Sequence, residues 1–396
     1  MTKPALHFAT SLLFVLPAAS VDVVGQAKVA CNACRGVGSN PCKKHKKAIE
    51  WEKNVDYCSV ASACATCGGT YRIDCKICDN PGVQDAAVVR KELVQKWFVD
   101  RREQVEKYTK SKKVLHVKSK HFNLTFTIAP MRIGKNPRPR PQHELMHIWV
   151  DRLEQHFAEF CKIFELTDQD FSVRVELYMF EKRSDHLVIT PRKLGSDAGS
   201  ASGKKYMGDK MIFSMWRLPR EMRNDDDMKR YMGHHVTHLF VNHMAPNTWI
   251  FNKGHGWIDA GIAHYFEYKA SALVTNYCYE EVAIDPGAGW KNGKWKSGVR
   301  LLVDARKQMF FRKFFLLNTD QLSLEAHALS FAYVDFLISA YGGAKMRDLI
   351  RLIKNKISTR DALRKVYSLT PLSIEEPFKK WVKKTYPRRE KERRRR

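Results

Sequence analysis

The apolar residues between positions 143 and 164 recur every three or four residues, which is the spacing of one helix face. They are Met146, Trp149, Val150, Leu153, Phe157, Phe160, Cys161 and Phe164. A similar pattern predicts helices over residues 86–113, 228–243, 257–270, 297–315, 325–341 and 346–355. Strands are predicted where the apolar period is shorter, over residues 121–128, 172–180 and 211–216.

Two polar segments separate these elements. Residues 135–142 are rich in proline and basic side chains, and residues 195–205 are rich in glycine and serine, so both predict loops. The apolar pattern as a whole predicts an α+β fold. It consists of a small N-terminal module, poor in large apolar residues, and a mostly helical domain with a short β-sheet.

The first 27 residues have the features of an export signal. Lys3 precedes a mostly apolar stretch at residues 6–16, and small residues follow at Ala18, Ser20, Gly25 and Ala27. The alternative is a buried N-terminal helix. No apolar run reaches the roughly 18–20 residues that a membrane span needs. The sequence therefore predicts an exported protein without a transmembrane span.

Eight of the ten cysteines lie between residues 31 and 78, and seven of them form a repeated pattern with one histidine. Each copy has two residue pairs with the same spacing inside and between the pairs, and the second copy follows the first by 33 residues. The first copy is Cys31, Cys34, Cys42 and His45, and the second is Cys64, Cys67, Cys75 and Cys78.

This spacing is typical of zinc ligands, because a Cys-x2-Cys turn points two sulfurs at one tetrahedral ion at about 2.3 Å. Disulfides are the alternative, since an exported chain meets oxidising conditions. The spacing leaves two arrangements open. Either each copy closes its own site, or the two outer pairs (Cys31/Cys34 and Cys75/Cys78) share one ion and the two inner pairs (Cys42/His45 and Cys64/Cys67) share another. Cys58 lies outside the pattern, and Cys161 and Cys278 are interpreted as single thiols of the later domain.

The segment from Cys31 to Gly38 reads Cys-Asn-Ala-Cys-Arg-Gly-Val-Gly. It resembles the repeating unit of the cysteine-rich domain of DnaJ-type chaperones, and the later pairs match only at the ligand positions. The resemblance implies two zinc ions in this module. It covers about fifty residues and does not extend to a J-domain.

The later domain contains the segments His234-His235-Val236-Thr237-His238 and Trp257-Ile258-Asp259-Ala260-Gly261-Ile262-Ala263-His264-Tyr265. Their order resembles the HExxH helix and the following W-x-(N/D)-E-G helix of the peptidase-MA-like (gluzincin) domains of bacterial secreted proteins, over residues 119–386. The resemblance implies zinc at His234 and His238, with a glutamate as base and another as third ligand. Here His235 stands at the position of the base and Ala260 at that of the third ligand.

These replacements predict a domain that has lost peptide hydrolysis, because a general base contributes roughly 10²–10⁴-fold to such a reaction. His264 lies one helical turn after Ala260, so a rebuilt site at His234, His238 and His264 remains an alternative. Asp259 neighbours the lost ligand but points about 100° away around the helix. If neither site forms, these histidines are polar residues that remain from a peptidase scaffold and bind no metal.

An intact HExxH sequence occurs at His143-Glu144-Leu145-Met146-His147. It would place two zinc ligands, His143 and His147, beside the general base Glu144. No helix of the W-x-x-E-G type follows at a suitable distance, so we interpret this segment as a packing helix. An active site here remains the alternative.

The net charge of +27 comes from 69 lysines and arginines against 42 acidic residues. Such a surface attracts polyanions, and in an exported protein an anionic envelope polymer or a protein or peptide partner is expected. No nucleic-acid-binding motif is present, so nucleic acid is not expected. The sequence does not indicate an oligomeric state.

Together, these features predict an exported zinc-binding protein whose metallopeptidase-like domain acts as a binding or scaffold module. The alternative is an active zinc metallopeptidase, at His143 and His147 or at the rebuilt site. The predicted regions are a signal peptide (1–27), the cysteine-rich module (28–85), a helical linker (86–118), the peptidase-like domain (119–386) and a basic tail (387–396).

Overall fold

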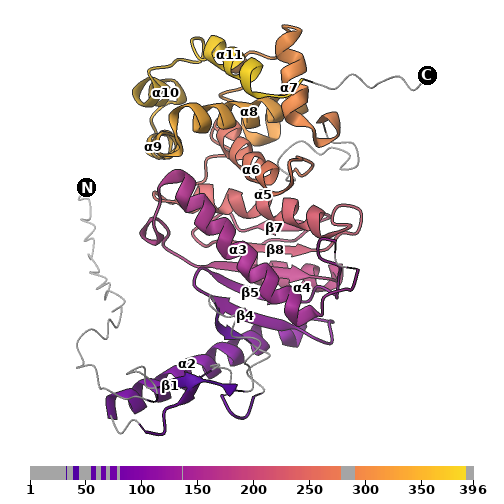
Figure 1. Ribbon diagram of the computed structural model, residues 1–396, viewed down its shortest axis with the longest axis vertical. Coiled ribbons are helices and arrows are strands. Elements are labelled where there is room, and N and C mark those ends of the chain that lie inside the picture. Colours follow the sequence, from indigo (N-terminus) through magenta and orange to yellow (C-terminus); the bar gives the residue numbers. More distant parts are fainter. Residues whose placement is uncertain are drawn as a thin grey trace, which may run out of the picture.

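The computed structural model describes residues 33, 39–43, 55–58, 64–67, 72–77, 81–135, 137–277 and 290–388. Figure 1 shows these parts of the chain in three tiers along the long axis. A small sheet and the long helix α2 (Pro81–Gln104) lie at one end, a larger sheet lies in the middle, and a group of helices forms the other end.

The larger sheet has six strands in the order β2-β4-β5-β6-β8-β7. The contacts β5–β6 and β6–β8 are parallel, and the other contacts are antiparallel. The central strands are buried at nearly every position, as expected for a sheet covered on both faces. The strands are β2 (Val55–Cys58), β4 (Leu115–Ser119), β5 (Phe122–Phe126), β6 (Val175–Phe180), β7 (Gly203–Lys205) and β8 (Ile212–Trp216).

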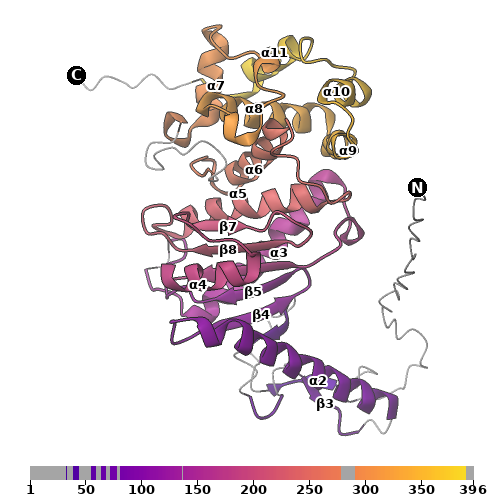
Figure 2. The same ribbon diagram turned by 180° about the vertical axis from the view of Figure 1, so that it is seen from behind.

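Helix α3 (Gln142–Phe164) covers one face of this sheet, and α4 (Arg183–Leu194) covers the other (Figures 1 and 2). On the α4 face, Phe180, Ile189 and Leu194 belong to a separate small core. The α3 face belongs to the main core of the protein. Each face of the sheet therefore has its own apolar partner.

The tier of helices at the other end is built on α5, α6 and α8. Helix α5 packs on α6, and α6 packs on α8. Side chains of α3 pack on this group, with Phe160 between Phe240 and Phe266 at ring distances of 5.2 and 5.4 Å. The helices of this tier are α5 (Asp225–His243), α6 (Gly256–Ser271), α7 (Trp295–Asp304), α8 (Leu324–Tyr341), α9 (Gly343–Lys354), α10 (Thr359–Tyr367) and α11 (Glu375–Thr385). None of the helices in the described ranges is both long and apolar enough to cross a bilayer.

The small sheet pairs two equivalent strands of the sequence repeat. Strand β1 (Ser39–Pro41) precedes Cys42, and β3 (Arg72–Asp74) precedes Cys75, at the repeat offset of 33 residues. The strands are antiparallel and centred on Asn40 opposite Ile73, so the copies meet about a local twofold axis. Strand β2, between the copies in sequence, instead joins the larger sheet through β4.

The predicted α+β class is confirmed, with a mostly helical chain and a limited amount of sheet. The predictions missed the helices α4, α10 and α11, and they missed the strands β1, β2, β3, β4 and β7. The helix predicted over 297–315 is wrong beyond Asp304. Arg306 adopts a left-handed φ of 55° and ends the helical path. Phe311, Phe314 and Phe315 are instead buried from a short 3-10 turn and the loop beside it.

The close contact between α6 and α8 depends on Gly261. A Cβ added there would lie 2.7 Å from the backbone oxygen of Ser330, whereas one added at Gly233 on α5 would lie 3.8 Å or more from any neighbour. We expect Gly261→Ala to destabilise the fold by about 1–3 kcal/mol through overpacking. The control Gly233→Ala should be neutral or stabilising by about 0.5–1 kcal/mol. Thermal unfolding of both variants measures the difference, and equal midpoints would contradict it.

Candidate metal centres

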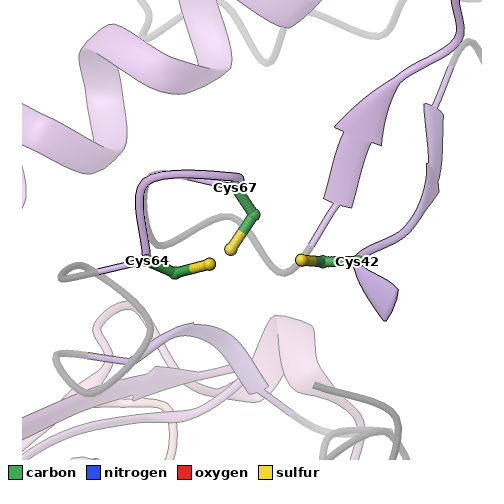
Figure 3. A group of neighbouring side chains, drawn as sticks. All are labelled: Cys42, Cys64 and Cys67. Carbon is green, nitrogen blue, oxygen red and sulfur yellow. The ribbon is translucent and has the colours of Figure 1, made fainter. Parts of the chain in front are cut away.

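Three cysteines, one from the first copy of the repeat and two from the second, lie close together. The sulfurs of Cys42, Cys64 and Cys67 lie within 4.8 Å of one another. Figure 3 shows Cys64 and Cys67 on one turn, with Cys42 approaching from the end of β1. Cys42 and Cys67 are buried and Cys64 is partly buried. This contact joins the inner pair of the first copy to the inner pair of the second.

The remaining predicted ligands of this module are only partly visible. Cys75 lies directly after β3 and is 8% exposed. The predicted ligands Cys31, Cys34, His45 and Cys78 lie outside the described residues, as do the predicted export signal and nearly all of the predicted basic tail. The described part therefore contains one group of three cysteines that could hold a metal ion.

The second cluster lies between α5 and α6. Asn224 caps the start of α5 by accepting the backbone N–H of Asp227 at 3.0 Å, and three aspartates in the first turn favour the helix dipole. His234 and His238 are four residues apart and face α6, with their Nε2 atoms 3.3 Å apart. Both side chains are buried.

Two carboxylates of α6 contact these histidines at their other ring nitrogens. The Nδ1 of His238 donates to Oδ2 of Asp259 at 2.7 Å, and the Nδ1 of His234 lies 3.3 Å from Oε2 of Glu267. His264 reaches the same Oε2 atom with its Nδ1, also at 3.3 Å. Its Nε2 lies 3.3 Å from Nδ1 of His327 on α8.

Glu267 is a functional candidate that the sequence analysis missed. His234, His264 and Glu267 form a group whose ligand atoms lie within 4.8 Å of one another, and each is 0% exposed. His238, which we had expected in such a set, is not part of this group. A sequence signal existed, since Glu267 follows Ala260 by seven residues and so lies on the same helix face.

Hydrogen bonds fix Glu267 in place from both sides. Its Oε1 accepts the backbone N–H groups of Thr275 and Asn276 at 2.6 and 2.9 Å, and the side-chain amide of Asn276 at 2.6 Å. Burial opposes the charged form, but the contacts with His234 and His264 outweigh it, and the pKa falls to about 2. The carboxylate is therefore ionised at neutral pH and held rigidly.

The two positions that the resemblance to peptidases assigns to a base and a third ligand are His235 and Ala260, and neither carries a carboxylate. His235 stacks on Phe213 at a ring distance of 5.2 Å, and its Nδ1 lies 3.2 Å from Nζ of Lys205. Ala260 is completely buried. A cavity lined in part by His238 and Asp259 has a volume of about 10 Å³. That is room for roughly one water molecule.

The third cluster contains the intact HExxH segment. His143 and His147 lie on the first turns of α3, and their Nε2 atoms are 2.8 Å apart. Cys58 of β2 approaches the pair, with its Sγ 4.0 Å from Nε2 of His147. Glu144 points elsewhere and pairs with Arg140 at 3.3 Å.

The comparisons with known proteins do not assign the chain to a group. No model of a known protein family matches it, and no curated protein matches it significantly.

A buried lysine holds the end of α5 beside the second cluster. Lys354 donates from Nζ to the carbonyl oxygens of Asn242 and Met244 at 3.0 and 2.7 Å. The amide of Asn242 in turn donates to Oδ1 of Asp259 at 2.7 Å. Burial lowers the pKa of Lys354 from 10.5 to about 7, although the charge of Asp259 acts in the opposite direction.

This shift predicts a pH-dependent stability. Between about pH 7 and pH 10.5 the unfolded chain binds a proton at Lys354 that the folded chain does not, so raising the pH across this window should stabilise the fold. Lys354→Met removes this contribution. Denaturant unfolding at several pH values should show a steeper rise in the wild type than in the variant. Parallel curves would contradict the shift.

Proposed function

We propose that this is an exported metal-binding scaffold protein, whose large domain has the form of a zinc metallopeptidase but does not hydrolyse peptides. The observation that carries the proposal is the position of Glu267. It lies between His234 and His264 in the protein core, instead of beside an accessible histidine pair. A carboxylate there suits a structural metal ion.

The distances at Glu267 are consistent with metal ligation. Two nitrogens bound to a tetrahedral zinc at about 2.0–2.1 Å lie about 3.3 Å apart, and edges to a carboxylate oxygen are similar. His234 and His264 each place Nδ1 at 3.3 Å from Oε2 of Glu267. Two histidines and a glutamate are also a donor set that zinc uses in other proteins.

The hydrogen bonds around the ligands favour this assignment. With metal at Nδ1, the Nε2–H of His234 donates to Nε2 of His238, whose Nδ1–H donates to Asp259. The Nε2–H of His264 likewise donates to Nδ1 of His327. Each ligand ring thereby has an orienting partner, as in known metal sites. Without metal, Nδ1 of His234 would donate to Glu267, as Nδ1 of His238 donates to Asp259. The two neutral rings would then face one another with an unprotonated Nε2 each, so one of them would need an extra proton.

The same geometry argues against hydrolysis. The ligand group is 0% exposed, so neither water nor a peptide has direct access to it. His235 is packed against Phe213, and its Nδ1 lies 3.2 Å from Nζ of Lys205, so the lone pair that a base would use faces an ammonium group. The cavity beside His238, about 10 Å³, does not admit a substrate.

In the cysteine-rich module, we propose two zinc ions. Three converging sulfurs suit a metal better than a disulfide, because a disulfide joins only two. His45 would complete the site of Cys42, Cys64 and Cys67. The local twofold between β1 and β3 would place Cys75 and Cys78 with Cys31 and Cys34 in an equivalent second site.

The basic surface and the export signal complete the proposal. A charge of +27 favours an anionic envelope polymer or an acidic protein or peptide as the partner. The competing function is an active metallopeptidase at His143 and His147. It receives less support because Glu144, its expected base, is paired with Arg140 and is not in the cluster.

For the large domain, we expect Glu267→Gln to remove one equivalent of metal from the full-length protein. The substitution keeps the size of the side chain but removes the anionic ligand. Glu375→Gln is the control, since Glu375 is also buried and bonded, to Phe311 and Tyr333, but lies outside the cluster. Elemental analysis of both variants makes the comparison. Retention of wild-type metal content in Glu267→Gln would overturn the proposed ion.

The absence of hydrolysis is tested separately. The purified wild-type protein, loaded with zinc, should release no peptide fragments from an unfolded protein substrate above the background of a chelator-treated sample. Cleavage that a chelator stops, and that zinc restores, would show that the domain is an enzyme.

For the cysteine module, Cys42→Ser should weaken one zinc site and expose the thiols of Cys64 and Cys67 to alkylation. Structural zinc sites of this kind supply about 10–16 kcal/mol of folding free energy, so loss of a ligand should loosen the module. Mass spectrometry after alkylation measures thiol protection. A wild-type module whose thiols are oxidised to disulfides would contradict zinc.

A further inference from the structure

One cysteine outside the repeat, Cys58, lies where the N-terminal region meets the large domain. It is the last residue of β2 and pairs with Val117 of β4 at the edge of the six-stranded sheet. Its side chain is 0% exposed. The chain between the two cysteine-rich copies thus crosses to the large domain, and its only described cysteine is buried there.

The first turns of α3 present two histidines at this point. His143 and His147 are four residues apart, so their side chains extend from one face of the helix. Their rings are 4.6 Å apart and inclined at 72°, with the Nε2 atoms 2.8 Å apart. The Sγ of Cys58 lies 4.0 Å from Nε2 of His147, and the three ligand atoms lie within 4.8 Å of one another.

These distances are close to those of a tetrahedral site. In zinc sites with Zn–N of about 2.0–2.1 Å and Zn–S of about 2.3 Å, adjacent nitrogens lie about 3.3 Å apart, and nitrogen and sulfur about 3.6 Å apart. The observed 2.8 and 4.0 Å lie on either side of these values. A shift of a few tenths of an ångström in each side chain would bring all three atoms onto one ion.

We infer that Cys58, His143 and His147 bind a divalent transition-metal ion of the zinc type. Binding forms one metal–sulfur and two metal–nitrogen bonds and releases the thiol proton of Cys58 to solvent. A water molecule or other outside ligand takes the fourth position. This site is independent of the sites proposed above, since it shares no residue with any of them.

The surroundings of the ligands support this assignment. The ring of His147 is buried, and its Nε2 lies within reach of both Nε2 of His143 and Sγ of Cys58. His143 is only partly buried, which leaves the cluster a path to solvent. The competing arrangement is a metal-free chain of hydrogen bonds from thiol to imidazole to imidazole.

The role of such an ion would be to fasten two parts of the chain. Strand β2 has four residues and lies at a sheet edge, so its own hydrogen bonds hold it weakly. An ion shared with α3 would fix this strand, and with it the cysteine-rich module, to the large domain. Glu144 faces Arg140, so hydrolytic chemistry is not part of the inference.

The test uses the full-length protein, with zinc and then cobalt as the metal. Cys58→Ser should lower the zinc content by one equivalent and should weaken the near-ultraviolet absorption of thiolate bound to cobalt. Cys161→Ser is the matched control. Cys161 is partly buried and belongs to none of the possible ligand groups among the described residues, so its loss should leave the metal content unchanged.

A second variant guards against effects on folding. His143→Gln changes a partly buried residue at the start of α3 and should cause the same loss of one equivalent, whereas His156→Gln on the same helix should cause none. Loss in both ligand variants, with wild-type content in both controls, supports the site. Wild-type zinc content in Cys58→Ser and His143→Gln would overturn it, whatever Glu267→Gln shows.

Discussion

Two buried carboxylates on α6 determine the orientation of two histidines on α5, the helix before it. The centre of the large domain is built around these contacts. Glu267 and Asp259 each contact the Nδ1 of a histidine on α5. Glu267 also binds the chain that follows α6, at Thr275 and Asn276. A charge in a medium of low polarity is costly unless it is fully paired, so these contacts must form together. The packing of α5, α6 and α8 follows from this requirement as much as from apolar burial.

Much of this architecture could be predicted from the sequence, because most helices have clear apolar faces. Helix α4 was missed since it mixes β-branched residues with Pro191, and only its packing on the sheet through Ile189 and Leu194 makes it a helix. His234 and His238 were found through their spacing. Glu267 and Cys58 were not found. Glu267 had a local signal in its helical spacing from Ala260, but its contact with His234 joins distant parts of the chain, as does the contact of Cys58 with His147. The repeat left open which of its residue pairs would meet, and the structure brings Cys42 of the first copy to Cys64 and Cys67 of the second.

The three clusters differ in what surrounds them, and this difference suggests different roles. Sulfurs at Cys42, Cys64 and Cys67 come from short segments with little apolar support, so an ion there would provide the folding energy itself. His234, His264 and Glu267 lie inside a large aromatic core that is stable through packing. Cys58, His143 and His147 join these two environments. A graded dependence on metal, strongest at the N-terminal end of the chain, would follow from this arrangement.

The path of β2 also has a consequence for how the molecule can be divided. Since residues 55–58 pair with β4, the sheet of the large domain takes an edge strand from inside the predicted cysteine-rich module. A fragment that began at residue 86 would lack this strand, and the backbone groups of Leu115–Ser119 would become a new open edge. Open edges pair readily with other chains. The two regions therefore share one sheet, and a large domain truncated at residue 86 would expose an edge through which copies could associate.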